Sequence, residues 1–519
     1  MTFKEYMTKP KIISLIMIFC LVIFCFIVAR IGLRRIIEPE TPLSSINIEA
    51  MFYVEMPDNG QIVCIGDGLI NSSDEKSGEM AVERSVVTAP DNSAFVGNSY
   101  HVVWNNIRHG ENGIEVYGKA ESGPKPERKV TASVRDFGAV GDGITDDTDA
   151  IQQAIYSCPN GELYFPTGTY VISNVIRIPS NIHIAGDSSN SIIIAKEGTK
   201  RGATMLKIYN ASNVKLENIC ISGNSSVNYE NMDTIGGIHL LDLSTSNNIT
   251  ISNCYFIDNI YAAIRDVNTN NVIVENCSFL NVDCGFITLG KYNTHDIIVR
   301  NCVFDGHRAS EPVSLFADGS HDNVLIENNH MSNKTSGCGV LVAGLQPNHN
   351  IRIINNVIDS CATGIKVVNS TNVQVLNNSI SNLTNGAGIR MYDCTDAVLG
   401  DNICYNIQQD GLEVKDCTNL TITNLTTTNC GQGNDNFVNV RFRGEKNSNV
   451  SFSDSSIEYN NTNSKVGLIF SCETDIDMNN IDYDNASIWL TKKTSNMSLS
   501  APSTVKVRDQ GQANEILKY

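Results

Sequence analysis

Two groups of charged residues along the 519-residue chain could take part in chemistry. Two carboxylates on either side of one glycosidic bond are the usual apparatus for hydrolysing that bond. The first group offers three aspartates for this role, with a histidine and an arginine nearby in the sequence. Its members, the candidate catalytic residues, are Asp233, His239, Asp258, Arg265 and Asp283.

The second group joins cations to a tyrosine and two acids, which suits the binding of an acidic sugar. β-Elimination on a uronate needs a base near the C5 proton and positive charge to stabilise the enolate, and Arg390 or Lys366 could supply that charge. The alternative is a solvated face on which Arg390–Glu413 and Glu413–Lys415 pair, each contributing little to stability. The candidate substrate-binding residues are Lys366, Arg390, Tyr392, Asp410, Glu413, Lys415 and Arg441.

A repeated unit must position both groups. Asn271–Gly290 contains an alternating strand, an Asn-Cys pair, a second short strand and a third strand led by glycine. The same arrangement recurs with its asparagine every 22 to 27 residues, at Asn253, Asn276, Asn301, Asn328, Asn355 and Asn377. A period in the twenties with strands in each unit indicates a solenoid, here of about eleven coils.

The marked asparagine is expected at a sharp turn, because asparagine tolerates left-handed backbone. We therefore interpret its column as structural rather than catalytic. The column comprises Asn218, Asn253, Asn276, Asn301, Asn328, Asn355, Asn377, Asp401 and Asn424.

The glycine-led third strand is expected to carry the functional face. Its first inward residues are predicted to be Ile238, Ile264, Phe286, Val313, Val340, Ile365, Ile389, Leu412 and Val438. The following residues then point outward, and they are His239, Arg265, Ile287, Ser314, Leu341, Lys366, Arg390, Glu413 and Asn439. This alignment places both charged groups on one face, separated by an apolar middle.

Cysteine and histidine usage argues against disulfides and metal sites. Cys254, Cys277 and Cys302 each follow the marked asparagine, so they should stack with parallel Cβ vectors, as free buried thiols rather than disulfides. The histidines at 295, 307, 321, 330 and 349 have no metal-ligand spacing, and we expect them to be residues of turns. No metal ligand is predicted.

Charge and hydropathy divide the N-terminal region from the rest. Residues 12–29 form an uncharged apolar run just long enough to span a bilayer as a helix. The net charge is −18; the first 35 residues carry +5, so the remainder carries −23, which is unsuited to nucleic acid. We expect a single-pass protein of the cell membrane with an extracellular domain. Its predicted parts are a cytoplasmic tail (1–11), an anchor (12–29), a tether (30–50), a small β-rich region with linker (51–129), the β-helix domain (130–491) and a C-terminal tail (492–519).

The segment from Val134 to Ile172 differs from the repeats. It reads VRDFGAVGDGITDDTDAIQQAI and then LYFPTGTY, and predicts a short amphipathic helix that caps the open end of the solenoid. This stretch resembles the N-terminal signature of pectate-lyase-like and polygalacturonase-like proteins, including the rhamnogalacturonase/epimerase-like pectate lyase group. The resemblance implies an all-β, right-handed parallel β-helix fold with an N-terminal helical cap. In this chain a single transmembrane helix and a small β-rich region would precede that fold.

The resemblance also implies where a polygalacturonase would hold its catalytic set. GGIHLLDLS, DNIYAAIRD and DCGFITLG resemble three successive coils of that family, and Asp233 and Asp258 are the counterparts of its acids. The family's paired aspartate is absent, and Cys284 stands where its histidine would be. These departures weaken an assignment to ordinary polygalacturonase hydrolysis.

Two hypotheses follow. The first is a membrane-anchored extracellular enzyme that cleaves a pectin-like or other uronate-containing polysaccharide by hydrolysis or β-elimination. The second is a non-catalytic glycan-binding or surface-structural β-helix. The expected partners are a polysaccharide and, through the N-terminal helix, a membrane, and nucleic acid is excluded. No cofactor is expected, apart from calcium in the case of a lyase, and the oligomeric state stays open, with a trimer as one option.

Overall fold

The computed structural model describes residues 132–518, apart from 201, 229–236, 290–292, 307–310, 334–335, 434–435, 459–465, 485 and 496, and the backbone of seven strands between 52 and 121. The predicted anchor at 12–29 lies outside the described residues. No helix among the residues that are described is long and apolar enough to cross a membrane.

The region before the repeats contains a seven-stranded sheet in the order β3-β6-β7-β2-β1-β4-β5. The elements are β1 (Phe52–Glu55), β2 (Gln61–Gly66), β3 (Gly78–Val82), β4 (Val86–Thr88), β5 (Ala94–Val96), β6 (Tyr100–Gly110) and β7 (Gly113–Glu121).

A short cap precedes the coils, as predicted. It comprises β8 (Ala132–Ser133), the 3-10 helix η3 (Val134–Phe137), β9 (Asp142–Asp146) and α2 (Thr148–Ser157). α2 buries Ile151, Ala154 and Ile155 against the first coil. The carboxylate of Asp147 is used in the preceding turn, where it accepts hydrogen bonds from the backbone N–H groups of Val140 and Gly141.

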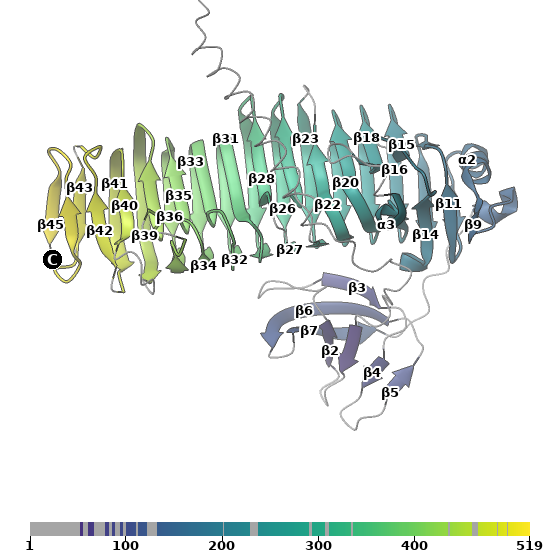
Figure 1. Ribbon diagram of the computed structural model, residues 1–519, viewed down its shortest axis with the longest axis horizontal. Coiled ribbons are helices and arrows are strands. Elements are labelled where there is room, and N and C mark those ends of the chain that lie inside the picture. The colour runs from purple at the N-terminus through teal and green to yellow at the C-terminus, as the bar shows by residue number, and fades with distance from the viewer. Residues whose placement is uncertain are drawn as a thin grey trace, which may run out of the picture. The chain divides into compact units, whose positions relative to one another are not determined.

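The remaining strands form an all-β parallel solenoid, which confirms the predicted architecture. Figure 1 shows its coils stacked in a row from α2 to β45. The solenoid has about 13 turns, so the predicted eleven is too low. The reason is that the first two coils, which contain β10 and β13, lack the asparagine that marks the turn in later coils.

Each coil contributes to three sheets. The first sheet is built from β10 (Glu162–Phe165), β13 (Ile182–Gly186), β16 (Ser212–Glu217), β19 (Asn247–Ser252), β21 (Asn270–Glu275), β23 (Thr294–Arg300), β26 (His321–Glu327), β29 (Asn348–Ile354), β31 (Thr363–Leu376), β33 (Ile389–Gly400), β36 (Thr418–Thr423), β39 (Lys446–Glu458) and β41 (Glu473–Asp482). The second sheet is built from β11 (Gly168–Ile172), β14 (Ser191–Ala195), β17 (Cys220–Ser222), β20 (Tyr255–Val267), β22 (Ser278–Thr288), β24 (Val303–Asp305), β27 (His330–Ser332), β30 (Val357–Asp359), β32 (Ser379–Ser381), β34 (Ile403–Ile407) and β37 (Thr426–Cys430), and continues into the long strands β39 and β41.

The third sheet carries the candidate site. Its strands are β12 (Ile176–Ile178), β15 (Thr204–Tyr209), β18 (His239–Ser244), then the C-terminal parts of β20 and β22, then β25 (Val313–Ala317), β28 (Cys338–Gly344), the N-terminal parts of β31 and β33, and β35 (Leu412–Lys415), β38 (Val440–Arg443), β40 (Val466–Phe470), β42 (Ser487–Leu490) and β44 (Val507–Asp509). β44 pairs with β42, so this sheet continues into the segment predicted as the C-terminal tail. The elements outside the three sheets are η4 (Ser188–Asn190), α3 (Ser225–Asn228), β43 (Ser498–Ala501) and β45 (Glu515–Lys518).

The asparagine column behaves as predicted. Every member from Asn218 to Asn424 has a positive φ, between 50° and 58°. A second, buried ladder lies one residue further along the chain and was not predicted. In it Asn329, Asn356 and Asn378 each donate an amide hydrogen bond to the next asparagine, ending at Asn402, at 3.0 Å per step. These ladders hold successive turns in register.

The interior confirms the prediction for the thiols. Every cysteine from Cys158 to Cys472 is free and buried. Cys254, Cys277 and Cys302 stack beside a column of phenylalanine rings, in which Phe256, Phe279 and Phe304 lie 5.0 and 4.5 Å apart in nearly parallel planes. The repeat thus turns identical side chains into continuous buried columns.

Candidate functional site

The register of the third sheet corrects the predicted alignment. Leu241, not Ile238, pairs with Ile264, and Val440, not Val438, pairs with Leu412. The outward row therefore contains Asp242 and Arg441 where His239 and Asn439 were expected. The glycine-led pattern misled the alignment because extra residues lie between the glycines and the paired part of each of these two strands.

The corrected outward row runs the length of the sheet, and we call this surface the third face. It reads Arg177, Lys207, Asp242, Arg265, Ile287, Ser314, Leu341, Lys366, Arg390, Glu413, Arg441, Ile469, Trp489 and Arg508. A parallel outward row contains Tyr209, Phe316, Tyr392, Lys415 and Arg443. Charged residues lie on both sides of an apolar middle at Ile287 and Leu341, and Arg265 is the member of the first predicted group that lies in this row.

Glu413 is the centre of the charged group at the C-terminal end. Its Oε2 accepts hydrogen bonds from Arg390 Nε at 2.9 Å and from the Tyr392 hydroxyl at 2.7 Å. Its Oε1 accepts one from Arg443 Nε, and Arg443 Nη2 also donates to the Tyr392 oxygen at 2.9 Å. Arg390 Nη2 is held by Gln409 at 2.6 Å. Glu413 is only 6% exposed, so these donors surround it.

Asp410 and Arg441 form a second pair in the same group. Arg441 donates to both oxygens of Asp410, at 2.8 and 3.1 Å, and to the backbone carbonyl of Asn436. The backbone N–H of Val438 donates to Asp410 at 2.8 Å. Lys415 pairs with Asp416 at 3.3 Å rather than with Glu413. We call the whole set the C-terminal cluster: Lys366, Arg390, Tyr392, Asp410, Glu413, Lys415, Arg441 and Arg443.

Tyr392 presents its ring to the cations of this cluster. The ammonium groups of Lys366 and Lys415 each lie 5.9 Å from the ring centroid, and the Arg443 guanidinium lies at 5.2 Å. These distances are within the range of cation–π attraction. Tyr392 is therefore both a hydrogen-bonding residue and the platform around which the cations are arranged.

The charge states of the cluster follow from burial and from these bonds. Burial opposes ionisation of Glu413, but the Tyr392 hydroxyl and the Arg390 and Arg443 charges outweigh it and hold the pKa of Glu413 below its ordinary value. Burial and the neighbouring Glu413 raise the pKa of Tyr392 to about 12. Burial also raises the pKa of Asp410, even against the Arg441 bonds. At neutral pH Glu413 is ionised and Tyr392 is protonated.

The predicted catalytic residues are brought together only in part. Asp233 lies outside the described residues. Asp258 is 3% exposed and its carboxylate holds a turn, because Ser225, the Ser226 backbone N–H and Asn281 all donate to it. Asp283 lies in β22, beside the buried Cys284.

His239 and Arg265 do lie near one another, around Asp242. Arg265 Nη1 donates to Asp242 Oδ2 at 2.6 Å, and Ser244 donates to the other oxygen. The His239 ring packs edge-on against Tyr261, with centroids 5.0 Å apart. Tyr261 has a φ of 121°, a conformation that a tyrosine adopts only under strain. Burial, and then the Arg265 charge, lowers the pKa of His239 to about 4, so its imidazole is neutral at pH 7.

The middle of the third face is apolar and has an exposed ring. Ile287, Ser314 and Leu341 occupy the outward row, and Phe316 in the parallel row is 57% exposed. Tyr209 precedes it at 61% exposed, with the Lys207 ammonium 5.5 Å from its centroid. Aromatic rings therefore recur along the face, exposed at Tyr209 and Phe316 and partly buried at Tyr392.

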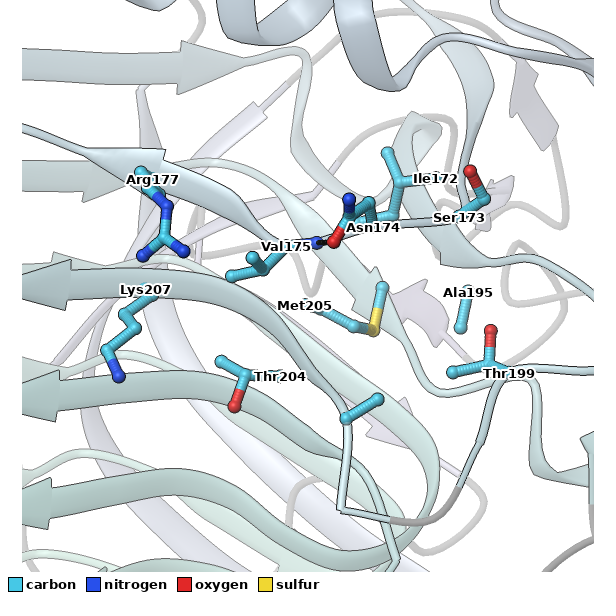
Figure 2. A pocket seen from close by; sticks show the side chains of 11 residues that line it. Ile172, Ser173, Asn174, Val175, Arg177, Ala195, Thr199, Thr204, Met205 and Lys207 are labelled. Atoms are coloured by element: carbon cyan, nitrogen blue, oxygen red, sulfur yellow. Dashed lines mark hydrogen bonds between the residues drawn. The ribbon is translucent and has the colours of Figure 1, made fainter.

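A pocket of about 310 Å³ opens at the N-terminal end of the face. Figure 2 shows Arg177 and Lys207 reaching from neighbouring strands on one side of it, Met205 in the middle, and Ala195 and Thr199 on the other side. No residue of this pocket was among the predicted site residues.

Other predictions about polar residues need correction. Four of the five histidines predicted in turns lie in strands instead: His295 in β23, His321 in β26, His330 in β27 and His349 in β29. His321 and His330 are buried, and His307 lies outside the described residues. His321 bonds to Thr294 at 2.7 Å, as part of a buried polar corner. Within the described part of the chain, no three His, Cys, Asp or Glu side chains are grouped as metal ligands.

Sequence reasoning missed Arg177, Lys207, Asp242, Tyr261, Gln409 and Arg443. Arg443 could have been found by alternation, because it lies two residues after Arg441 in the same strand. Asp242 and Lys207 required the correct register. The strained backbone of Tyr261 leaves no signal in the sequence.

Two family models match parts of the chain. Residues 131–218 match the model described as rhamnogalacturonase A/epimerase, pectate lyase-like, and residues 292–441 match the right handed beta helix region. These matches confirm the predicted resemblance to pectate-lyase-like right-handed parallel β-helix proteins.

Among curated proteins, plasmin and fibronectin-binding protein A of Streptococcus pneumoniae is 29% identical over 302 residues, which are 54% of this chain and 40% of that protein. The preneck appendage protein of Bacillus phage PZA is 29% identical over 163 residues, covering 30% and 17% of the two chains. Mannuronan C5-epimerase AlgE2 of Azotobacter vinelandii is 42% identical over 72 residues, covering 12% and 7%. This chain thus spans well under half the length of each.

Similar chains are also found among solved structures, at lower identity. The crystal structure of PfbA, a surface adhesin of Streptococcus pneumoniae, has a TM-score of 0.46 at 18% identity and covers 70% of this chain and 94% of that one. The Azotobacter vinelandii mannuronan C-5 epimerase AlgE4 A-module has a TM-score of 0.46 at 15% identity, covering 74% and 99%. The names of these relatives span an adhesin, epimerases and phage proteins, and one fold can host several functions.

Proposed function

We propose that the third face binds an acidic polysaccharide lengthwise and that the C-terminal cluster recognises its carboxylates. The observation that carries this proposal is the arrangement around Glu413. One buried carboxylate fixes Arg390, Arg443 and Tyr392 in position, so little side-chain entropy is lost when a ligand binds them.

The cluster keeps donors free for a ligand. Arg390, Arg441 and Arg443 each use Nε and Nη2 within the cluster, and within the described part of the chain their Nη1 groups have no partner. A guanidinium has five N–H donors, and a planar carboxylate is the acceptor that fits them. Lys366 has no carboxylate partner among the described residues, so it adds an uncompensated charge.

The shape and composition of the face fit a long ligand. Lys366, Arg390, Glu413 and Arg441 occupy four successive strands, which span roughly 14 Å at the spacing of parallel strands. The exposed rings of Tyr209 and Phe316 and the partly buried ring of Tyr392 offer stacking surfaces for sugars along the same line. On a chain with a net charge of −18, a concentration of cations on one face favours a polyanionic partner.

A second candidate function is β-elimination on a uronate, with His239 as base and Arg265 as the cation. The favouring observation is the strained Tyr261 packed against a neutral histidine, because strain of this kind clusters at functional sites. A neutral imidazole accepts a proton, and a guanidinium stabilises an enolate. Hydrolysis is less well supported, since Asp242 and Asp258 are both occupied by donors within the fold.

We also propose that residues 12–29 anchor the chain at the cell surface, with the β-helix outside the cell. A large polyanionic glycan is an extracellular partner, which agrees with this placement. Neither candidate function calls for a cofactor, apart from calcium in the case of elimination. Membrane fractionation of cells that express the full chain, with protease added outside, tests the anchor: the β-helix must sediment with membranes and be accessible.

Binding and turnover are tested together on a panel of acidic and neutral polysaccharides. The full chain should bind uronate polymers and should not bind neutral ones. The ultraviolet absorbance of unsaturated products reports elimination, and reducing ends report hydrolysis. Unsaturated products that disappear in His239→Ala would establish the second candidate, whereas binding without either product leaves recognition as the function. Equal binding to neutral and acidic polymers would refute the proposal.

A further inference from the structure

We propose that the pocket beside Arg177 and Lys207 binds one acidic sugar, the end residue of the polysaccharide that the proposed function places on the third face. Arg177 is the first residue of the outward row and Lys207 is its neighbour on the next strand. A polymer lying along the row therefore ends at this pocket. This inference rests on the proposed function, which supplies the polymer. The pocket itself is a separate binding site from the C-terminal cluster.

The two cations of the pocket are uncompensated. Among the described residues neither Arg177 nor Lys207 makes an ion pair, although ion pairs occur on the sheet nearby, such as Lys215–Glu217 at 3.2 Å. Their strands are adjacent, so the two charged groups can reach one carboxylate from the same side. A bound anion would therefore break no ion pair of either cation among the described residues, although Lys207 also lies 5.5 Å from the Tyr209 ring centroid.

The rest of the lining suits a sugar ring. Ile172, Val175, Ala195 and Met205 offer an apolar surface for its C–H face. Hydroxyl groups for its polar edge come from Ser173, Thr199 and Thr204. At about 310 Å³ the pocket lies at the lower end of the range for small-ligand sites, which limits its occupant to one or two sugar rings.

The walls of the pocket are fixed by hydrogen bonds. Asn228 is fully buried, and its carbonyl oxygen accepts from the backbone N–H groups of Gly198 and Thr199 at 2.8 and 3.2 Å. Thr199 also donates to the carbonyl of Lys196 at 2.6 Å. On the other side, Gln152 of α2 bonds the backbone of Arg177 in both directions, at 2.7 and 2.9 Å. The pocket is thus formed before any ligand arrives.

Calorimetric titration of the full chain with glucuronate, glucose and inorganic sulfate tests the inference. Saturable binding of glucuronate alone is expected. The double variant Arg177→Ala/Lys207→Ala should weaken it at least tenfold, and Thr204→Trp should do the same by filling the pocket with the charges intact. Lys215→Ala, which removes a cation from a neighbouring sheet, is the matched control and should bind as the unaltered chain does.

Three results would overturn the inference: no saturable glucuronate binding, equal binding by the pocket variants and the control, or sulfate binding as tight as glucuronate. The proposed function fails in a different way. Lys366→Ala/Arg390→Ala should lose polymer binding and still bind glucuronate. If the pocket variants keep full affinity for the polymer while this cluster variant loses it, the pocket inference falls and the proposed function stands.

Discussion

The two ends of the third face both carry cations, but in different states. At the C-terminal end Arg390, Arg441 and Arg443 are each bonded to a buried carboxylate. At the N-terminal end Arg177 and Lys207 have no acid partner among the described residues. Cations that are paired with an acid are already held in place, but they attract an anionic ligand less strongly. Unpaired cations keep their full charge, and their side chains lose conformational entropy when they bind a ligand.

The two ends of the third face therefore offer a bound polymer different kinds of contact. The C-terminal cluster offers a rigid set of donors that can select the geometry of a carboxylate. The N-terminal pair offers a stronger local field inside a pocket. A polymer that reaches both would gain from two sites joined by one chain.

Buried acids show the same contrast. Glu413 accepts from three side chains, whereas Asp266, fully buried in the third sheet, has Thr269 as its one donor, and its Oδ2 has no partner in the described part of the chain. Burial raises the pKa of Asp266 to about 7, while the donors around Glu413 lower its pKa.

The largest predicted effect is on the pH dependence of stability at Asp266. In the folded chain the pKa of Asp266 is about 7, above the ordinary value of 3.8. Between these two pH values the folded chain therefore binds more protons than the unfolded chain. The free energy of unfolding falls as the pH rises from about 4 to 7. Asp266→Asn should therefore stabilise the protein at pH 8, by at most about 4 kcal/mol. Urea unfolding of both proteins at pH 5 and pH 8 measures this difference.

The unaltered protein must be compared with Asp266→Asn, because His239 and His321 change the stability in the opposite direction as the pH changes. Burial lowers both histidine pKa values to about 4, so their contribution to stability is lost as pH falls from about 6.5. A variant effect that is the same at pH 5 and pH 8 would show that Asp266 is not a buried acid with a raised pKa.

Removing the centre of the C-terminal cluster should have the next largest effect. Glu413→Ala leaves the buried sides of Arg390 and Arg443 and the Tyr392 hydroxyl without their acceptor, at a cost of about 3 kcal/mol in the free energy of unfolding. Chemical denaturation measures this loss, with Glu413→Gln as the control that keeps the shape. A loss for Glu413→Ala under about 0.5 kcal/mol would mean that the cluster is not held by this residue.

Tyr392→Phe separates the two roles of the tyrosine. The change removes the hydroxyl bonds to Glu413 and from Arg443, and should cost about 1 kcal/mol of stability. It keeps the ring, so Tyr392→Phe should lower the affinity for a uronate polymer less than Tyr392→Ala does. Equal affinities for the two variants would show that the Tyr392 ring is not part of the binding surface.

The smallest effect is expected at the N-terminal end. Arg177→Ala removes no ion pair in the described part of the chain, so its stability should stay within about 0.5 kcal/mol of the unaltered protein. The midpoint of thermal unfolding checks this. A clear loss of stability would show that Arg177 is a structural residue and would erase the difference between the two ends.

The fold could be predicted because every coil repeats the same physical constraints. Asparagine at each left-handed turn, apolar residues at alternate positions and cysteine beside the turn each mark a column. The number of coils was less accessible, because the N-terminal coils around β13 and the final β44 lack that mark.

The C-terminal cluster could be predicted in composition but not in connectivity. Alternation places Arg390, Tyr392 and Glu413 on one surface, yet only the register shows that Arg441 lies beside Glu413 and Arg443 beside Lys415. The first group was harder to predict. The predicted alignment was displaced by three residues at Leu241, so it put His239 in the outward row where the structure has Asp242. Hydrogen bonds that assign Asp258 to a turn come from α3, which is distant in sequence.

The most direct test of acidic-glycan binding on the third face is the affinity of the full chain for a uronate polymer, measured beside Lys366→Ala/Arg390→Ala and the Lys215→Ala control. The cluster variant should bind at least tenfold more weakly, and the affinity of the unaltered chain should fall as salt is raised, because the contacts are between charges. Equal affinities for the cluster variant and the control would contradict the assignment of binding to this face.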